Sequence, residues 1–373
     1  MSLMRELNQK AQRLGIPLSA HLDVTYRCNE RCEHCYLDHT DHGEMSTEEI
    51  RSLLGQLADA GVFFLTLSGG EALLRRDCFE IIEAARALGF NIKLKTNAVL
   101  IRDDEAQRLR SLGVEQVQVS VYSHRAEMHD AITKLPGSLV RTLAGVRRLR
   151  AAGLKVTLAN VLMRSNVQDS EGVRSLAAEL GANYSLDPTI TPMIDGNVSV
   201  LRHRVAADQL DAIFHDTNLV GDVENFCAPP PAVDDETREG LPCSAGHTAC
   251  YISPYGEVYP CVQFPLACGN VRRQPFLEIW QHSPQFAEVR AIRGKDLSVC
   301  SSCAHLGSCT RCPGLAYMEG NMRGPSSADC EKAFVRTGIL PATIQNPEPA
   351  QRRPPGLVQI EARPPLAEMQ TVR

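Results

Sequence analysis

The sequence predicts an α/β fold in which short strands alternate with helices. Between about residues 18 and 187, short apolar runs alternate with longer amphipathic segments. Glycine follows most of the amphipathic segments, as expected where helices end. Repeated strand–helix units are typical of parallel strands covered by helices. Six such units suit a partial barrel or an open doubly wound sheet, and the pattern alone does not choose between them.

The expected elements follow one another in a regular order. The strands are expected at 20–26, 62–68, 91–96, 114–123, 155–163 and 182–187. The helices are expected at 47–61, 77–89, 103–113, 137–153 and 170–181. The first of these helices has Ser46 or Thr47 as its cap and Gly61 after its end. Ligands are expected at the carboxyl ends of the strands.

The strand–helix pattern stops near Val200, and the chain is therefore divided into four parts. Residues 1–17 form an N-terminal extension, 18–226 the strand–helix domain, 227–335 a cysteine-rich domain and 336–373 a proline-rich tail expected to be mostly disordered. The stretch from Cys227 to Pro242 has the composition of a linker. The cysteine-rich part has few periodic segments, and small folds of this kind usually need metal or cross-links.

Charge and hydropathy argue against several classes of protein. The net charge of −5 and the pI of about 6.1 give no electrostatic reason to expect a nucleic-acid partner. The N-terminal residues carry scattered charges and lack the apolar segment of a signal peptide. No stretch approaches the roughly 18–20 apolar residues that span a membrane. We therefore expect a cytoplasmic protein without a membrane partner.

The cysteines are the unusual part of the composition. Three of the fourteen lie at 28–35 and ten lie between 227 and 330. Disulfides are disfavoured in a reducing compartment, so clustered thiols there indicate metal or redox chemistry. Cys78 and Cys227 stand apart from the clusters, and we expect both to be free thiols rather than ligands.

The first cysteine cluster directly follows the first expected strand. Cys28, Cys32 and Cys35 can hold three irons of a cubane cluster and leave the fourth iron open. A structural zinc or iron site would have a fourth ligand, and no further cysteine occurs before Cys78. A zinc site remains the alternative, with a histidine as the fourth ligand, namely His34, His39 or His42.

A second motif, Ser68-Gly69-Gly70-Glu71, ends the second expected strand. It is therefore expected at the same edge of the sheet as the cysteines. Glycines at this position allow close backbone approach, and Glu71 can accept a cationic amine. Either motif alone is weak evidence, but the pair favours one shared binding site.

Cys-x3-Cys-x2-Cys followed by Gly-Gly-Glu resembles the radical S-adenosylmethionine (SAM) superfamily over about residues 18–200. The resemblance implies a partial (β/α)6 TIM-like barrel. It also implies an oxidoreductase that reductively cleaves SAM to a 5′-deoxyadenosyl radical, which abstracts a substrate hydrogen. The implied electron donor is a flavodoxin or a ferredoxin.

The resemblance also assigns residues to the site. It implies that Cys28, Cys32 and Cys35 hold a [4Fe–4S] cluster. The residues that it places at SAM are Tyr36, Gly69, Gly70, Glu71, Asn97, Ser120 and Met163, with Leu162 beside the adenine pocket. No residue is identified as a catalytic acid or base.

The cysteine-rich part resembles the SPASM extension of radical SAM maturases, which holds auxiliary iron–sulfur clusters. The segments GEVYPC and GNVRRQPFLEIW carry this resemblance. It implies one auxiliary cluster on Cys243, Cys250, Cys261 and Cys312, and a second on Cys300, Cys303, Cys309 and Cys330. Zinc in this region is the alternative.

The match to this extension has two departures. Only Thr310 and Arg311 separate Cys309 from Cys312, where the family often has three residues. Cys268 also lies near Cys250 in sequence and competes with it as a ligand. One auxiliary cluster could therefore have an open iron or only two irons.

The SPASM resemblance implies a peptide or protein substrate that is cross-linked or oxidised on a side chain. Val262 stands where anaerobic sulfatase-maturing enzymes have an Asp, and Cys309 stands where the enzyme of pyrroloquinoline quinone synthesis has an Asp ligand. About 17 residues precede the first strand, so a leader peptide would bind the barrel mouth, the cysteine-rich region or a separate leader-binding protein. A tetrapyrrole or other small-molecule substrate is the alternative, and a non-catalytic iron–sulfur or zinc scaffold is a remote one.

Overall fold

The computed structural model describes residues 3–345, and its centre is one sheet of nine strands. The strand order is β6-β5-β4-β3-β2-β1-β7-β8-β9. The strands are β1 (Ser19–Thr25), β2 (Phe64–Gly69), β3 (Asn91–Thr96), β4 (Gln116–Ser120), β5 (Lys155–Val161), β6 (Asn183–Asp187), β7 (Ala249–Ile252), β8 (Glu257–Tyr259) and β9 (Gly269–Asn270). All pairs from β6 to β7 are parallel, whereas β8 and β9 are antiparallel additions.

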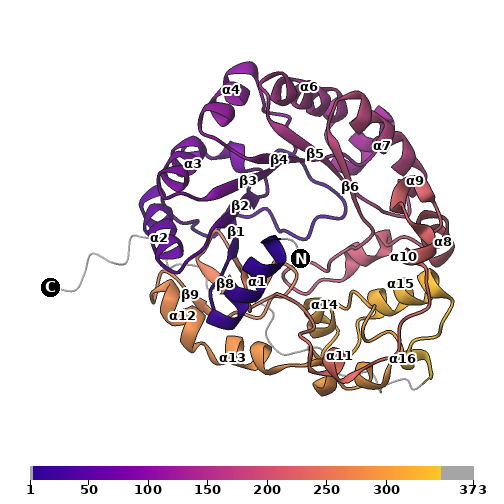
Figure 1. Ribbon diagram of the computed structural model, residues 1–373. Coiled ribbons are helices and arrows are strands. Elements are labelled where there is room, and N and C mark those ends of the chain that lie inside the picture. Colours follow the sequence, from indigo (N-terminus) through magenta and orange to yellow (C-terminus); the bar gives the residue numbers. More distant parts are fainter. Residues whose placement is uncertain (1–2, 346–373) are drawn as a thin grey trace.

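Helices cover the outer face of the six N-terminal strands (Figure 1). They are α2 (Thr47–Asp59), α3 (Cys78–Ala87), α4 (Asp103–Ser111), α5 (Ala126–Thr133), α6 (Ser138–Ala151) and α7 (Ser170–Glu179), and α1 (Leu3–Leu14) precedes β1. The predicted strand–helix order is confirmed, and the sheet is open, as in a partial barrel. Helix α5 lies in a segment where no element was predicted.

Local sequence explains where the helices begin. Ser46 caps α2 by accepting a hydrogen bond from the backbone N–H of Glu49, and the Glu49 side chain accepts one from the N–H of Ser46. This reciprocal capping box satisfies two N–H groups that a helix start leaves unpaired. The predicted cap at Ser46 is therefore confirmed.

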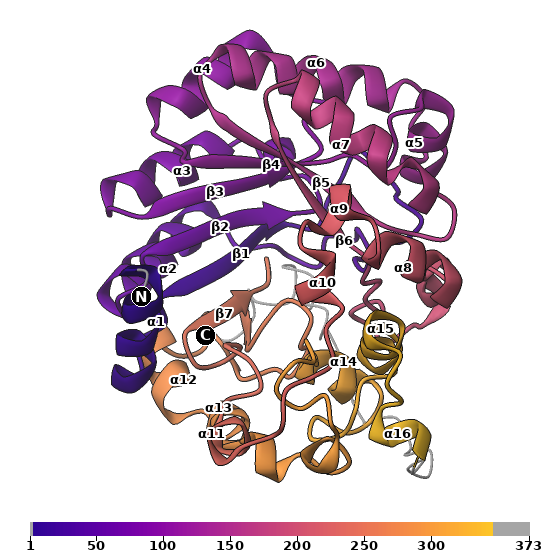
Figure 2. The same cartoon turned by 45° about the vertical axis from the view of Figure 1, so that its right-hand side comes forward.

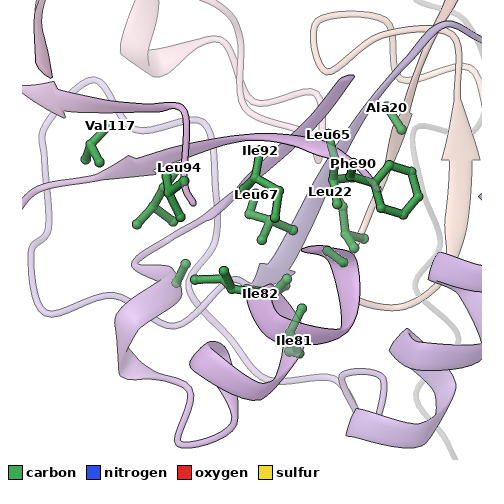
Figure 3. Packing of buried hydrophobic residues seen from close by; sticks show 14 of the residues in the cluster. Ala20, Leu22, Leu65, Leu67, Ile81, Ile82, Phe90, Ile92, Leu94 and Val117 are labelled. Atoms are coloured by element: carbon green, nitrogen blue, oxygen red, sulfur yellow. The ribbon is translucent and has the colours of Figure 1, made fainter. Parts of the chain in front are cut away.

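Alternate residues of the strands form the core between the sheet and the helices. Leu67, Ile92 and Leu94 are buried and point toward Ile81 and Ile82 of α3 (Figure 3). Successive strand residues face opposite sides of a sheet, so the polar residues between them face inward. The inner face of the partial barrel is therefore polar, and its outer face is apolar.

The C-terminal region continues the same sheet. β7 pairs with β1 in parallel, with Ser19 opposite Ala249 and Leu22 opposite Ile252. The side chain of Trp280 joins the main core and donates a hydrogen bond of 2.6 Å to the carbonyl of Gly15. Figure 2 shows this region, coloured orange to yellow, packed along the side of the sheet that the outer helices leave open.

Short helices make up most of the remaining chain. They are α8 (Ala207–Phe214), α9 (Thr217–Val220), α10 (Val223–Phe226), α11 (Asp235–Glu239), α12 (Phe276–His282), α13 (Pro284–Ala291), α14 (Pro313–Met318), α15 (Ser327–Thr337) and α16 (Ala342–Gln345). The 3-10 turns are η1 (Ala72–Leu74), η2 (Val167–Asp169), η3 (Ser199–His203), η4 (Gly294–Asp296) and η5 (Cys300–Ser302). Of the predicted tail at 336–373, residues 346–373 lie outside the described residues. Among residues 3–345, no helix combines the length and hydrophobicity needed to cross a membrane.

Candidate functional site

A cavity of about 550 Å³ opens at the carboxyl ends of the parallel strands. The strand order brings the two predicted motifs together on its wall, because β1 and β2 are neighbours. The predicted residues that line it are Cys28, Cys32, Cys35, Tyr36, Gly69, Gly70, Asn97 and Ser120. The cavity thus lies where the sequence placed a ligand.

The loop after β1 folds so that its three thiols share one wall. The backbone N–H of Glu30 donates to the sulfur of Cys28 at 3.4 Å, and the N–H of Cys35 donates to the carbonyl of Cys32 at 3.0 Å. Burial raises the pKa of Cys28 to about 12 and that of Cys35 to about 11. The thiols are therefore protonated without metal, and binding iron would release their protons.

The three histidines of the zinc alternative make contacts of their own. The His34 ring packs edge-on against Tyr122 with 4.8 Å between ring centroids. His39 Nδ1 lies 3.2 Å from the carbonyl oxygen of Tyr26. His42 Nε2 lies 2.9 Å from a carboxylate oxygen of Asp38. Within residues 3–345, no three His, Cys, Asp or Glu side chains are grouped closely enough to hold a single metal ion.

Gly69 and Gly70 let the end of β2 lie directly on the chain that enters the cysteine loop. A Cβ atom on Gly69, whose φ is +138°, would lie 2.1 Å from the carbonyl oxygen of Thr25. A Cβ atom on Gly70 would lie 2.5 Å from the carbonyl oxygen of Arg27. The N–H of Gly70 donates to Thr25 and that of Glu71 to Arg27. The two motifs therefore form one backbone unit.

The Glu71 side chain lies behind the cavity wall rather than on it. It is fully buried, and its carboxylate accepts hydrogen bonds from the Thr96 hydroxyl at 2.9 Å and the Asn97 N–H at 2.8 Å. The Asn97 amide in turn donates to Asn29 at 2.9 Å. Burial raises the pKa of Glu71. This carboxylate thus fixes the residue after β3, which itself faces the cavity.

Some of the remaining predicted SAM residues face the cavity, and others lie behind its wall. Tyr36, Asn97 and Ser120 face the cavity. Met163 is fully buried in an apolar cluster with Tyr122 and is not among the lining residues. Leu162 belongs to a different apolar cluster.

Further lining residues were missed at the sequence level: His21, Lys95, Gln118, Asn160 and Asp187. His21 Nε2 lies 3.1 Å from the carboxylate of Asp23, which is fully buried and also accepts a bond of 2.9 Å from the Tyr251 hydroxyl. Burial lowers the pKa of His21 and of Lys95. A signal for these residues was present in the sequence. Parallel strands that are buried on both faces are usually apolar throughout, whereas these strands alternate apolar and polar residues.

The cysteine-rich region supplies the facing wall of this cavity. Val262 and Gln263, which follow Cys261 directly, line it. The Gln263 amide donates to the Thr191 hydroxyl at 2.9 Å and so joins the region to the segment after β6. A molecule in the cavity would therefore lie between the first cysteine loop and Cys261.

The second predicted auxiliary set lies around its own cavity of about 730 Å³. Its four lining cysteines are Cys300, Cys303, Cys309 and Cys330. The N–H of Cys303 donates to Cys300 across the η5 turn, at 3.1 Å. Burial raises the pKa of Cys300 to about 11 and that of Cys309 to about 12. Four thiols around one space form a donor set that suits an iron–sulfur cluster.

The first predicted auxiliary set is Cys243, Cys250, Cys261 and Cys312. Burial, and to a smaller extent neighbouring cysteines, raise the pKa of three of these thiols: Cys243 acts on Cys261, Cys261 on Cys312, and Cys261 and Cys268 on Cys250. Cys250 and Cys268 are both buried in the main core. Cys78 faces that core from α3, and Cys227 contacts the carbonyl of Phe214 at 3.5 Å.

Two parts of the chain match family profiles. Residues 22–176 match the radical SAM superfamily, and residues 243–313 match SPASM, an iron–sulfur cluster-binding domain. Among solved structures, Streptococcus suis SuiB bound to S-adenosylmethionine has a TM-score of 0.70 at 19% identity, over 87% of this chain and 80% of that one.

Curated relatives span most of the chain. The AdoMet-dependent heme synthase of Methanosarcina barkeri is 29% identical over 320 residues, 79% of this chain and 90% of that protein. The mycofactocin maturase of Mycobacterium tuberculosis is 29% identical over 357 residues, 90% of each. The PqqA peptide cyclase of Xanthomonas campestris is 31% identical over 379 residues, 93% of this chain and 97% of that protein.

Proposed function

This chain belongs to the radical SAM superfamily and carries a SPASM iron–sulfur domain, and on that premise we propose that it modifies a ribosomally made peptide or protein by a cross-link or a side-chain oxidation. The observation that carries the proposal is the shared cavity, with Cys28, Cys32 and Cys35 on one wall and Val262 and Gln263 on the other. The likeness to a peptide cyclase over almost the whole chain supports it.

The first cysteine loop and the strand ends have separate tasks in this proposal. When bound, a [4Fe–4S] cluster and SAM supply a 5′-deoxyadenosyl radical that abstracts a hydrogen atom from the substrate. Cys28, Cys32 and Cys35 would hold the cluster, since their thiols share one wall of the cavity. The residues that would contact SAM are Tyr36, Gly69, Gly70, Asn97 and Ser120.

Glu71 and Met163 act from behind the wall. Glu71 is a positioning residue, because its carboxylate fixes the backbone of Asn97 and the Thr96 hydroxyl. Met163 packs against Tyr122, whose hydroxyl lies 3.7 Å from the Cys32 sulfur. Both therefore influence the site through their neighbours.

The cysteine-rich region would hold two auxiliary iron–sulfur clusters. One would bind to Cys300, Cys303, Cys309 and Cys330, and the other to Cys243, Cys250, Cys261 and Cys312. An auxiliary cluster near Val262 can take the electron that oxidation of the substrate releases. A flavodoxin or ferredoxin would supply electrons to the first cluster, and a separate leader-binding protein would deliver the peptide.

The heme synthase relatives support a tetrapyrrole as the second candidate substrate. We favour a peptide, because the likeness to the PqqA peptide cyclase covers 93% of this chain and the likeness to the heme synthase 79%. The polar walls, which include His21 and Lys95, suit a peptide and the carboxylate groups of a tetrapyrrole alike. The same cavity must also hold SAM.

Two measurements test the proposed function. The anaerobically reconstituted, reduced protein should form 5′-deoxyadenosine from SAM, whereas the C28A/C32A/C35A variant should form none. Failure of the fully iron-loaded protein to form it would exclude the radical SAM reaction. Co-expression with a peptide encoded beside the gene should then change the mass of that peptide. Turnover of an iron tetrapyrrole with no change in the peptide would support the second candidate.

A further inference from the structure

Two arginines in the cysteine-rich region share an arrangement that the proposed function does not yet use; Arg311 is buried and Arg290 is partly buried. Arg290 donates through Nε to the carbonyl of Gly246 at 2.7 Å and through Nη1 to that of Trp280 at 2.6 Å. Arg311 donates to the carbonyls of Gly324, at 2.7 Å, and of Met322. In each, the third nitrogen, Nη2 of Arg290 and Nη1 of Arg311, is buried and has no hydrogen-bond partner.

Neither arginine forms an ion pair with Asp or Glu within the described part of the chain. Buried cations are normally paired with an anion or bound to several acceptors. Asp329 lines the same cavity as Arg311, but it contacts Lys332 at 2.7 Å and accepts the Cys312 N–H at 2.8 Å. Each site therefore contains a fixed positive charge without a carboxylate partner.

Each arginine lies beside one of the two predicted cysteine sets. Arg311 lines the cavity of the second set together with its four cysteines. Arg290 binds the carbonyl of Gly246, whose own N–H donates to the carbonyls of Ala249 and Pro260. These two residues directly precede Cys250 and Cys261 of the first set. The missing anion in both places would be supplied by thiolates and a cluster, since a cluster with four thiolate ligands carries net negative charge.

The aromatic packing of Arg290 shows that its position is fixed. Its guanidinium lies 4.3 Å from the ring centroid of Trp280 and 4.9 Å from that of Phe286, and both rings are buried. The attraction of the cation to the two rings and its hydrogen bonds to two carbonyls hold the guanidinium at this place. It therefore acts as a permanent local charge.

We propose that Arg290 and Arg311 are cationic positioning residues, each of which stabilises the reduced state of one auxiliary iron–sulfur cluster. This inference rests on the proposed function, because it assumes both clusters. One-electron reduction adds a negative charge to a cluster, and a fixed cation nearby favours that state over the oxidised one. Arg290 would act on the cluster of the first set and Arg311 on that of the second.

The test uses the full chain with C28A/C32A/C35A, so that only auxiliary clusters give a signal. Iron is counted after anaerobic reconstitution, and midpoint potentials are measured by redox titration followed by electron paramagnetic resonance. Arg290→Gln and Arg311→Gln should each lower the midpoint potential of a different cluster by about 59 mV, which is about a tenfold change in the one-electron reduction equilibrium. Arg290→Lys and Arg311→Lys, which keep the charge, should recover part of the shift.

Arg150→Gln is the matched control. Arg150 also donates to a carbonyl, that of Leu154 at 2.7 Å, and has a buried nitrogen without a partner. It lies in α6 and lines neither of the two cavities, so both potentials should stay unchanged. If both glutamine variants load iron fully and keep unchanged potentials, the role of the two arginines is overturned and the proposed function still stands. Fewer than about eight irons before any arginine is changed would also overturn the assignment of two four-iron clusters.

Discussion

Gly70 is the residue at which the end of β2 touches the cysteine loop. We expect Gly70→Ala to prevent this contact, because its Cβ would lie 2.5 Å from Arg27 O and 2.6 Å from Tyr26 O, both rigid backbone atoms. Iron loading, measured by an iron assay, and SAM affinity, measured by calorimetry, should both fall at least tenfold. Gly55→Ala is the control, since nothing lies within 4 Å of its added Cβ. That variant, in the middle of α2, should gain about 0.5–1 kcal/mol in stability.

Glu71 gives a second prediction for a single residue. Glu71→Gln replaces a carboxylate that accepts bonds from Thr96 and Asn97 by a group with one acceptor oxygen and two added N–H donors. We expect the free energy of unfolding to fall by about 1–3 kcal/mol, as for other buried groups left without a partner. Urea unfolding of the cluster-free protein measures this. If Glu71 instead touched only SAM, the unfolding of the SAM-free protein would not change.

The role of Glu71 also shows what a sequence leaves open at this scale. The Gly-Gly-Glu motif and its place at the end of β2 were predictable from the residues. The direction of the Glu71 side chain was not, because it depends on the η1 turn that follows, in which Glu71 accepts the N–H of Leu73. His21 and Lys95 were missed for a related reason, since a polar residue within a strand shows its face only after the register is known.

At the level of elements, the start of α3 is joined to α2 by one carboxylate. Asp77 accepts two hydrogen bonds from Arg75, at 2.9 and 2.6 Å, and one from the Thr47 hydroxyl at 2.6 Å. Burial alone would raise the pKa of Asp77, but these hydrogen bonds outweigh it and lower the pKa to about 2. The ionised form therefore stabilises the contact between the two helices.

Asp77→Asn should accordingly lower the free energy of unfolding at neutral pH by about 1 kcal/mol, a value reduced by partial exposure to solvent. The pKa is depressed in the folded state, so this contribution is present above the ordinary aspartate value and is lost as the pH falls toward 2. Urea unfolding of the wild-type and Asp77→Asn proteins should show a smaller difference in the free energy of unfolding at pH 3 than at pH 7. A constant difference would mean that charge is not involved.

Most elements were predictable, and the exceptions have physical reasons. The strands 91–96 and 183–187 and their covering helices agree with the sequence pattern to within a residue or two. Helix α5 was missed because it is short and lies between β4 and α6, in a segment interpreted as the loop before the next helix. The pairing of β7 with β1 was missed because β7 has four residues and its partner lies more than 200 positions earlier.

For the whole molecule, the shared sheet predicts that the barrel and the cysteine-rich region depend on each other. A chain cut after residue 242 would lose β7, whose pairing covers one edge of β1, and Trp280 from the main core. We expect this shortened chain to be insoluble or unfolded by circular dichroism. The full chain with C28A/C32A/C35A should stay folded, because those thiols line a cavity and lie outside the main core. A soluble, helical shortened chain would show that the regions fold independently.

The position of β1 has a consequence for how the protein is made. β1 leaves the ribosome early, and β2 pairs with one of its edges soon afterwards. Its other edge stays open until residues 249–252 have been synthesised. An uncovered strand edge is a site of mispairing between chains, and pairings this distant in sequence form slowly. Overexpressed chains should therefore benefit from slow translation and from chaperones that shield nascent strands, whatever the supply of iron.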